Sequence, residues 1–334
     1  GITQIWVAEG TYKPTSGTDR NISFAMKNGV EILGGFPNTG DPGLGDRDWA
    51  AHVTVLSGEI GVAGMADNSY SIVRNGSVNS TAILDGFQLV YANGGGALHN
   101  EANASPSIRN CTFMSNLSGY GGAVYNFINC TPTFTNCVFI GNQSVQWGAA
   151  CFTENTSVAT FINCSFSGNT GNPGVIYSNG QAVLKNCIIW GNGTQSIAGV
   201  ATITYSIIQG DHAGAGNFDA DPLFVSQPPI GLGTAGDLHL QDCSPGIDAG
   251  NDTDAPTTDF DQNARVDAIT GGNLADVGAY EYQTASSIPG GNIWYVNAAN
   301  AVSGHGKSWD CASKDLRVVL ARAVSGDQIW VAEG

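Results

Sequence analysis

The sequence is poor in charged residues, and most of its charge has one sign. Only 12% of the 334 residues are charged, and 12 Lys and Arg stand against 28 Asp and Glu, which gives a net charge of −16. Nucleic acids and anionic membrane surfaces are bound by basic patches, so this composition argues against both partners. We expect the acidic charge to serve solubility or cation binding.

Several sequence features of other protein classes are also missing. No apolar run approaches the roughly 20 residues of a transmembrane helix, and no signal peptide opens the chain. The eight cysteines form no C-x-x-C pair, which argues against zinc and thioredoxin-type sites. The middle of the chain lacks helical periodicity, whereas hydrophobic residues recur there in short strand-like runs. We therefore predict a folded, β-rich chain.

A repeated Asn-Cys dipeptide dominates the middle of the chain. It opens the strings NCTFMSN, NCVFIGN, NCSFSGN and NCIIWGN, which begin at Asn110, Asn136, Asn163 and Asn186. The strings begin 26, 27 and 23 residues apart. Repeats of this length predict a solenoid, in which each unit buries its apolar face only against its neighbours.

Each repeat predicts about three short strands separated by bends. Strict alternation of apolar residues fails at Asn110, and asparagine tolerates the left-handed backbone conformation that a bend there requires. Gly86 and Tyr205 hold the same place in the flanking units. We expect equivalent side chains to lie in columns, coil on coil, about 4.8 Å apart. The predicted columns are the first-bend residues Asn110, Asn136, Asn163 and Asn186, the inward cysteines Cys111, Cys137, Cys164 and Cys187, and the second-bend residues Asn116, Asn142, Asn169 and Asn192.

The predicted cysteine column has two interpretations. Stacked buried thiols pack as small hydrophobic groups. Disulfides between adjacent coils are the less favoured alternative.

Two short motifs carry a resemblance to a known family. GGA followed by an aliphatic residue occurs at residues 95–98 and 121–124, and FxxN occurs at Phe113, Phe139 and Phe166. This pattern resembles the repeats of polymorphic outer-membrane proteins and related bacterial right-handed parallel β-helix proteins, over roughly residues 84–208. The resemblance implies a three-sided right-handed coil. We therefore expect an all-β fold, a right-handed parallel β-helix of about nine coils with three strands each.

The segment after the repeats has a different character. It contains DADPLF at 219–224, TDFDQNARVD at 258–267 and DVGAYEY at 276–282. These strings resemble the C-terminal cap of secreted β-helix proteins that carry a choice-of-anchor type of domain, which implies export and surface attachment. We expect residues 1–218 to form the coils, residues 219–282 the C-terminal cap and residues 283–292 a linker.

The string QIWVAEG occurs twice, at Gln4–Gly10 and at Gln328–Gly334. Residues 293–334 predict a strand, a helix with Leu316, Val319, Leu320 and Ala323 on one face, and a final strand. Ser313 is the predicted N-cap of that helix. In the family that the chain resembles, such an element is the N-terminal cap. We therefore expect residues 293–334 to be the N-terminal cap of a following tandem unit, and the sequence to be one period of a longer protein.

Catalytic chemistry has little support in the coils. β-Helix hydrolases need two or three carboxylates close together, and lyases need a base beside carboxylates that hold calcium. The charged residues between 101 and 210 are Glu101, Arg109, Glu154 and Lys185. We therefore expect no enzyme activity and no organic cofactor.

One candidate metal site lies in the segment after the repeats. Asp259, Asp261 and Asn263 alternate as the oxygen ligands of a calcium loop do, although Ala264 and Thr270 replace the Gly and the bidentate Glu of an EF-hand. Calcium is the predicted ion, and an Asp-rich turn without an ion is the more favoured interpretation.

These features predict a non-catalytic structural module of a large secreted tandem-repeat bacterial surface protein. Such a module forms a rigid fibre, stalk or adhesin by coil stacking and end-to-end self-association. One alternative is a carbohydrate-binding or polysaccharide-cleaving β-helix, in which aromatic residues such as Trp147 and Trp190 stack on glycans. A second alternative is an autotransporter-type passenger domain. Each of them places the chain outside the cell or on its surface.

Overall fold

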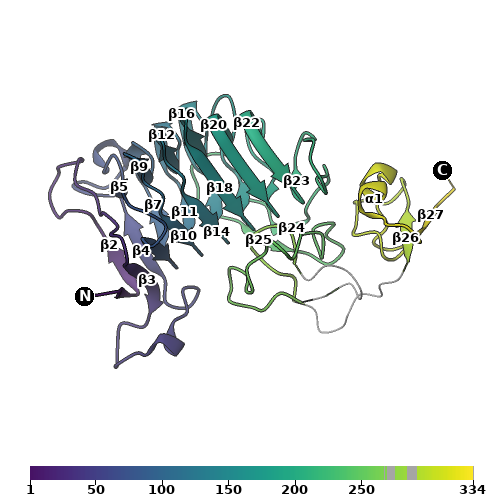
Figure 1. Ribbon diagram of the computed structural model, residues 1–334, viewed down its shortest axis with the longest axis horizontal. Helices are drawn as coiled ribbons and strands as arrows, with labels where there is room; N and C mark the ends of the chain where they lie inside the picture. The colour runs from purple at the N-terminus through teal and green to yellow at the C-terminus, as the bar shows by residue number, and fades with distance from the viewer. Residues whose placement is uncertain (267, 269–274, 284–291, 334) are drawn as a thin grey trace.

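Short parallel β-strands stacked along one axis make up most of the regular structure (Figure 1). The computed structural model describes residues 1–266, 268, 275–283 and 292–333. Within these ranges the helices are α1 (Leu316–Arg322) and two single 3-10 turns, η1 (Leu44–Asp46) and η2 (Met65–Asp67). No helix among the described residues has the length and apolar character needed to span a membrane.

One sheet takes a strand from every coil. Its eight parallel strands follow one another in chain order, so eight coils can be counted along it, close to the nine expected. The strands are β2 (Gly10–Tyr12), β4 (Thr54–Ser57), β7 (Gln88–Val90), β11 (Thr112–Met114), β15 (Val138–Ile140), β19 (Ser165–Ser167), β21 (Ile188–Ile189) and β23 (Ile207–Ile208).

The largest sheet has twelve strands because one long strand joins two faces. The first residues of β20 (Ile176–Lys185) pair with β17, and its last five pair with β18. The first face contains β1 (Gln4–Ala8), β3 (Glu31–Phe36), β6 (Ile83–Asp85), β10 (Ser107–Arg109), β14 (Thr133–Thr135) and β18 (Val158–Ile162). The second contains β5 (Val73–Gly76), β9 (Leu98–Glu101), β13 (Val124–Asn126) and β17 (Cys151–Thr153), and β22 (Ile197–Thr204) extends both.

The third parallel sheet is short. Its strands are β8 (Asn93–Gly94), β12 (Leu117–Tyr120) and β16 (Gln143–Trp147). Three stacked parallel sheets confirm the predicted right-handed parallel β-helix.

The in-register pairing of the strands builds the core. Phe113, Phe139 and Phe166 occupy one column, with ring centroids 4.9 and 4.5 Å apart in parallel stacks. Phe134 stacks on Phe161 in the same way at 4.9 Å. All five rings are fully buried. Stacked aromatic pairs add to the free energy of simple apolar burial, so these columns help to stabilise the middle coils.

Backbone conformation confirms the predicted bends. Asn110, Asn136, Asn163 and Asn186 all have φ between 48° and 54°, and Gly86 and Tyr205 share the left-handed conformation. At the second bend the left-handed residue is the one before the asparagine, such as Ser115 or Gly141. The second-bend asparagines therefore keep an ordinary backbone and turn their side chains inward.

The described residues between 219 and 283, here called the flank segment, lie along the side of the solenoid. It includes the antiparallel pair β24 (Phe224–Ser226) and β25 (Asp237–Leu240). The flank segment and the outer face of the eight-stranded sheet form one apolar cluster. In it, Val138, Ile188 and Ile207 of the sheet pack with flank residues such as Val277. The sequence predicted a cap at the end of the coils and did not predict this position on their flank.

The final described segment, residues 292–333, is here called the end unit. Its strands β26 (Ile293–Val296) and β27 (Gln328–Val331) are parallel neighbours, with α1 packed beside them, as the strand–helix–strand prediction requires. The predicted N-cap is wrong, because Asp315 and not Ser313 accepts the hydrogen bond from the Arg317 amide. The end unit and the N-terminus lie at opposite ends of the long dimension of the molecule (Figure 1).

Candidate functional site

The second-bend asparagines form a continuous hydrogen-bonded ladder. The Nδ2 of Asn116 donates to Oδ1 of Asn142, that of Asn142 to Asn169, and that of Asn169 to Asn192, each at 3.0 Å. The first three are fully buried. Each Oδ1 also accepts the backbone N–H of the preceding ladder residue. The four coils that carry these asparagines are thus tied together by side chains as well as by strand pairing.

A second asparagine ladder, which was not predicted from the sequence, runs parallel to the first. The Nδ2 of Asn75 donates to Oδ1 of Asn100 at 3.1 Å, and that of Asn100 to Asn126 at 2.9 Å. All three are buried. The strings GGALHN and GGAVYN, which end at Asn100 and Asn126, carried the signal for this ladder in the sequence.

The first-bend asparagines anchor the flank segment. The Nδ2 of Asn163 donates to the carbonyl oxygens of Asp276 and Gly278 at 3.0 and 3.1 Å. Asn186 donates to the carbonyl of Asn251 and accepts that residue's N–H in return. Bonds within the column join only Asn136 to Asn110 and Asn186 to Asn163. This column therefore serves two purposes, as a ladder and as a docking line.

The predicted cysteine column is present and holds free thiols. Cys111, Cys137, Cys164 and Cys187 are fully buried, and no disulfide joins them. Burial raises the pKa of Cys111 and of Cys164 well above the usual value of a thiol. Thiols held neutral in this way are poor nucleophiles and poor metal ligands, so the column contributes packing.

Several ionisable residues of the coils form pairs. Glu101 accepts two hydrogen bonds from the Arg74 guanidinium, Lys185 pairs with Asp254 at 2.6 Å, and Glu154 accepts the Tyr125 hydroxyl at 2.9 Å. These contacts join neighbouring strands, or join the coils to the flank segment.

The three predicted calcium ligands lie in one turn of the flank segment. Asp259 is buried, and its two carboxylate oxygens accept the N–H groups of Asn263 and Glu281. Asp261 binds His239 at 2.6 Å, and this bond raises the pKa of His239 to about 9. The acceptor oxygens of Asp259 thus shape the turn itself, and the calcium site stays a prediction.

A different group of carboxylates converges nearby. Asp248, Asp276 and Glu281 are buried and place oxygens within 4.8 Å of one another, which makes them the candidate cation ligands of the flank segment. The guanidinium of Arg265 lies 2.8 Å from Glu281. Burial, and then the charge of Glu281, raise the pKa of Asp276 well above its usual value. Because the guanidinium and backbone N–H groups already bind these carboxylates, the arrangement resembles a buried ion cluster that holds the segment together.

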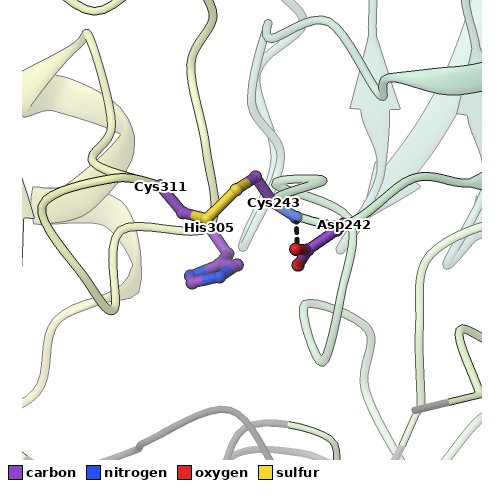
Figure 2. A group of neighbouring side chains, drawn as sticks. All are labelled: Asp242, Cys243, His305 and Cys311. Carbon is purple, nitrogen blue, oxygen red and sulfur yellow. Dashed lines mark hydrogen bonds between the residues drawn. A yellow bond between two sulfur atoms is a disulfide. The ribbon is translucent and has the colours of Figure 1, made fainter.

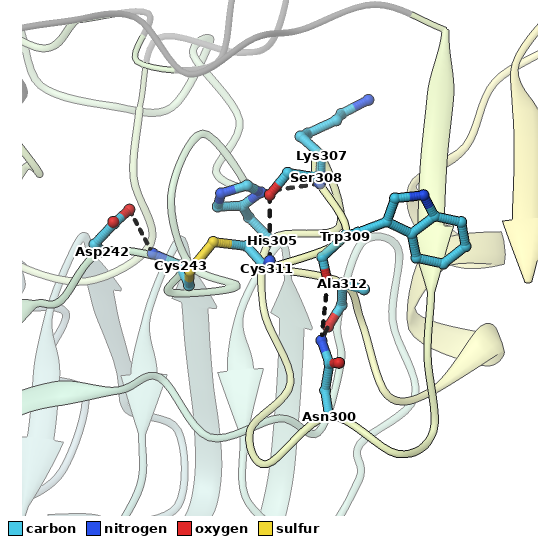
Figure 3. The surroundings of a disulfide bond; sticks show 9 residues. All are labelled: Asp242, Cys243, Asn300, His305, Lys307, Ser308, Trp309, Cys311 and Ala312. Atoms are coloured by element: carbon cyan, nitrogen blue, oxygen red, sulfur yellow. Dashed lines mark hydrogen bonds between the residues drawn. A yellow bond between two sulfur atoms is a disulfide. The ribbon is translucent and has the colours of Figure 1, made fainter. Parts of the chain in front are cut away.

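A disulfide fastens the end unit to the flank segment. Cys243 is bonded to Cys311, and Figure 2 shows His305 and Asp242 beside the bridge. The four side chains form a group with metal-ligand chemistry, but both sulfurs belong to the disulfide, and a thiolate is what binds a metal. His305 is 1% exposed, and its Nδ1 accepts the Lys307 amide at 3.0 Å (Figure 3). Burial lowers the pKa of His305 to about 4, so the ring is neutral.

Helix α1 supplies a second link between these parts. The half-buried Arg322 donates to the carbonyl oxygens of Pro245 and Ile247 at 3.0 and 3.3 Å. Burial lowers its pKa to about 10, against the attraction of Asp248 and Asp276. Val318 packs into the apolar cluster of the flank segment. These contacts orient α1 in a way the sequence did not predict, since Val318 is buried and Leu320 is 57% exposed.

The two copies of QIWVAEG have the same local structure at opposite ends of the molecule. Both are parallel strands with one neighbour, β3 for β1 and β26 for β27. In the first copy Nε1 of Trp6 donates to Oε1 of Gln4 at 3.2 Å. In the second, Trp330 donates to Gln328 at 3.1 Å. The repeat in the sequence is thus also a repeat in structure.

Aromatic side chains form a stripe on the outside of the coils. Tyr125, Phe152 and Tyr177 follow one another at the outward position of successive strands, with ring centroids 5.5 Å apart. Trp147 lies over them and is 37% exposed, beside Tyr120 at 5.2 Å. Trp190, the other predicted glycan-stacking residue, packs instead against the flank segment.

Comparison with known proteins agrees with this architecture. No curated protein and no solved structure matches the chain. Residues 95–218 match the family described as right handed beta helix region. The matched range contains the Asn and Cys columns of the middle coils.

Proposed function

We propose that the chain is a non-catalytic structural module of a large secreted tandem-repeat bacterial surface protein, in which successive units form a rigid fibre, stalk or adhesin. One observation carries the proposal. The end unit, whose last strand repeats the first strand of the chain, is fastened to the far end of the molecule by the Cys243–Cys311 disulfide and by Arg322. A unit that begins again where the previous one ends is what a tandem fibre requires.

The interior of the coils supports a mechanical role. Two buried asparagine ladders and columns of stacked phenylalanines repeat from coil to coil. The middle coils are bonded to their neighbours by strand pairs as well as by these side chains, so bending the solenoid there breaks many contacts at once. The disulfide agrees with export to an oxidising compartment.

A two-unit chain tests this proposal. In the two-unit chain, Gly334 of the first copy is joined directly to Thr11 of the second copy, because Gly334 and Gly10 occupy the same position of the repeat. Electron microscopy should show a straight rod of twice the single-unit length with a constant joint angle. Two particles joined at variable angles would contradict it. A matched chain with a Gly/Ser insertion after Gly334 provides the flexible reference.

The second candidate function is glycan binding by the aromatic stripe. Its motivating observation is the exposed Trp147 beside the half-buried Tyr120, Tyr125 and Tyr177, since flat rings stack on sugar faces. A glycan array, repeated with Trp147→Ala, tests it. Trp309→Ala removes a similarly exposed tryptophan, 42% accessible, in the end unit and is the matched control. Equal binding by both variants, or blank arrays for the unmodified chain, would reject this candidate.

A further inference from the structure

We propose that β1 of one copy of this chain is covered by β26 and α1 of a second copy, so that a single QIWVAEG strand lies between β26 of one unit and β3 of the next. This inference rests on the proposed end-to-end assembly and names its contact surface. It follows from three differences between β1 and β27. In each of them, one of the two QIWVAEG strands is covered on a side where the other strand is exposed.

The first difference is in the backbone. The carbonyl of Thr3 accepts the Glu31 amide, and the Glu9 amide donates to Phe36, so these groups face β3. In the second copy the amides of Gln328 and Ala332 donate toward β26, to Asn292 and Val296. Their equivalents in the first copy are Gln4 and Ala8. Neighbouring residues of a strand direct their backbone groups to opposite sides, so the amide of Gln4 faces the open edge of β1.

The second difference is in the apolar side of the strand. Ile5 is 45% exposed at the end of the coil core, whereas its equivalent Ile329 packs against the end-unit cluster that contains Trp294 and Val319. The order is reversed two residues later. Val7 packs against the coil core, whereas its equivalent Val331 is 59% exposed. One strand placed between β26 and β3 would bury both positions.

The third difference is in the outward aromatic side. Trp6 stacks on Phe36, on the β3 side, with ring centroids 4.8 Å apart. Its equivalent Trp330 meets Tyr295, on the β26 side, at 5.8 Å. The two tryptophans use neighbours on opposite sides of the strand. A shared strand would therefore carry one tryptophan between a tyrosine and a phenylalanine.

The register of the joint follows from the pairs already present. Ile293 lies opposite Gln328, Trp294 opposite Ile329 and Tyr295 opposite Trp330. In the joint the strand partners are therefore Ile293 with Gln4, Trp294 with Ile5 and Tyr295 with Trp6 of the next copy. In separate chains β27 competes with the incoming β1 for β26, because both strands fit the same place. Association of separate chains is accordingly weak until β27 is loosened.

Proline substitution at equivalent positions tests the exchange in the full chain. Gln328→Pro removes the amide that β27 donates to β26 and should strengthen association about tenfold, the factor that about 1.4 kcal/mol gives. Gln4→Pro removes the equivalent amide at the open edge of β1, so adding it to Gln328→Pro should restore the monomer. Gln4→Ala and Gln328→Ala keep the amides and are the matched controls. Sedimentation velocity over a range of concentrations measures the association.

Two results would overturn the inference. One is association of Gln328→Pro no stronger than that of Gln328→Ala, and the other is association that Gln4→Pro fails to suppress. Amide exchange of Gln328→Pro provides an independent measurement, since its Gln4 amide should become protected as concentration rises. Constant exchange at that amide would also overturn it. Straight rods from the two-unit chain combined with such negative results would reject this joint and leave the proposed fibre standing.

Discussion

Trp49 and Phe260 are far apart in the sequence and joined in the structure, where the indole Nε1 of Trp49 donates to the Phe260 carbonyl at 2.8 Å. Trp49 lies between β3 and β4, in the early coils, and Phe260 lies in the flank segment after the last coil. The flank segment therefore runs back over most of the solenoid and fixes early coils to late ones.

Trp49→Phe should loosen this contact and leave the coils intact. A smaller aromatic ring replaces the indole and one hydrogen bond is lost, and the lost bond alone costs about 1 kcal/mol. Hydrogen exchange should become faster in residues 258–264 and stay unchanged in the middle coils. Trp309→Phe, in the end unit, is the control. Equal acceleration throughout the chain would show that the contact stabilises the fold as a whole.

Asn142→Ala should destabilise the coils strongly. Asn142 is fully buried and bonds to Asn116, Asn169 and the Phe113 carbonyl. Its loss leaves buried donors and acceptors unpaired, with a cost of about 3 kcal/mol in the free energy of unfolding. Denaturant unfolding measures this. Asn155→Ala, at an exposed turn, should change stability by less than about 0.5 kcal/mol. Similar small effects for both variants would refute a structural role for the ladder.

Arg322→Met should release the end unit from the flank segment. The change removes two bonds to buried carbonyls and the positive charge near Asp248 and Asp276. Losing hydrogen bonds from a charged, half-buried group to buried carbonyls costs about 1.5–3 kcal/mol. Exchange of the β26 and β27 amides should rise steeply. Arg317→Met removes an exposed ion pair with Asp315 from the same helix and should have little effect.

Reduction should expose two thiols and spare six. The disulfide spans 68 residues, and the chain-entropy model gives a loop of that length about 4 kcal/mol of stabilisation. Thiol labelling under mild reductant should modify Cys243 and Cys311 rapidly, while the buried cysteines of the coils stay protected. A Cys243→Ser, Cys311→Ser chain should melt at a lower temperature than the oxidised parent and show no response to reductant. Rapid labelling of more than two thiols would mean that the coils open as well.

Acid should loosen the end unit through His305. The unfolded histidine titrates near pH 6.5, and the folded one, with its pKa lowered by burial, only near pH 4. The unfolded state therefore binds more protons between these two pH values. The contribution of His305 to the free energy of unfolding is fully present above pH 6.5, and about 3 kcal/mol of it is lost by pH 4. Thermal melting between pH 7 and 4 measures this loss. His305→Asn keeps an acceptor for the Lys307 amide and should flatten the dependence; an unchanged slope would assign it to other groups.

The local rules of the coils could be predicted from the sequence, because each is set by neighbouring residues. A broken alternation at Asn110 predicted a left-handed bend, and its regular recurrence predicted the columns. The Asn75, Asn100 and Asn126 ladder was equally local, but it ends in Thr153 after two strings, so the pattern was short. The position of the flank segment depends on contacts such as Trp49 with Phe260 and Asn163 with Asp276. Such contacts between distant residues leave no periodic pattern in a single sequence.

The two buried asparagine ladders also give the solenoid a direction. Each bond between two ladder asparagines runs from the earlier coil to the later one. The same Nδ2 groups of Asn116, Asn142 and Asn169 also donate to backbone carbonyls of the earlier coil. In these Asn-to-Asn bonds the Oδ1 atoms accept from the earlier coil and the Nδ2 atoms donate to the later coil, so the amide dipoles within each ladder point the same way. Joining two such solenoids by like ends would point their ladder dipoles in opposite directions, whereas joining unlike ends keeps the dipoles aligned. The polarity of any filament built from this chain is therefore already present inside each subunit.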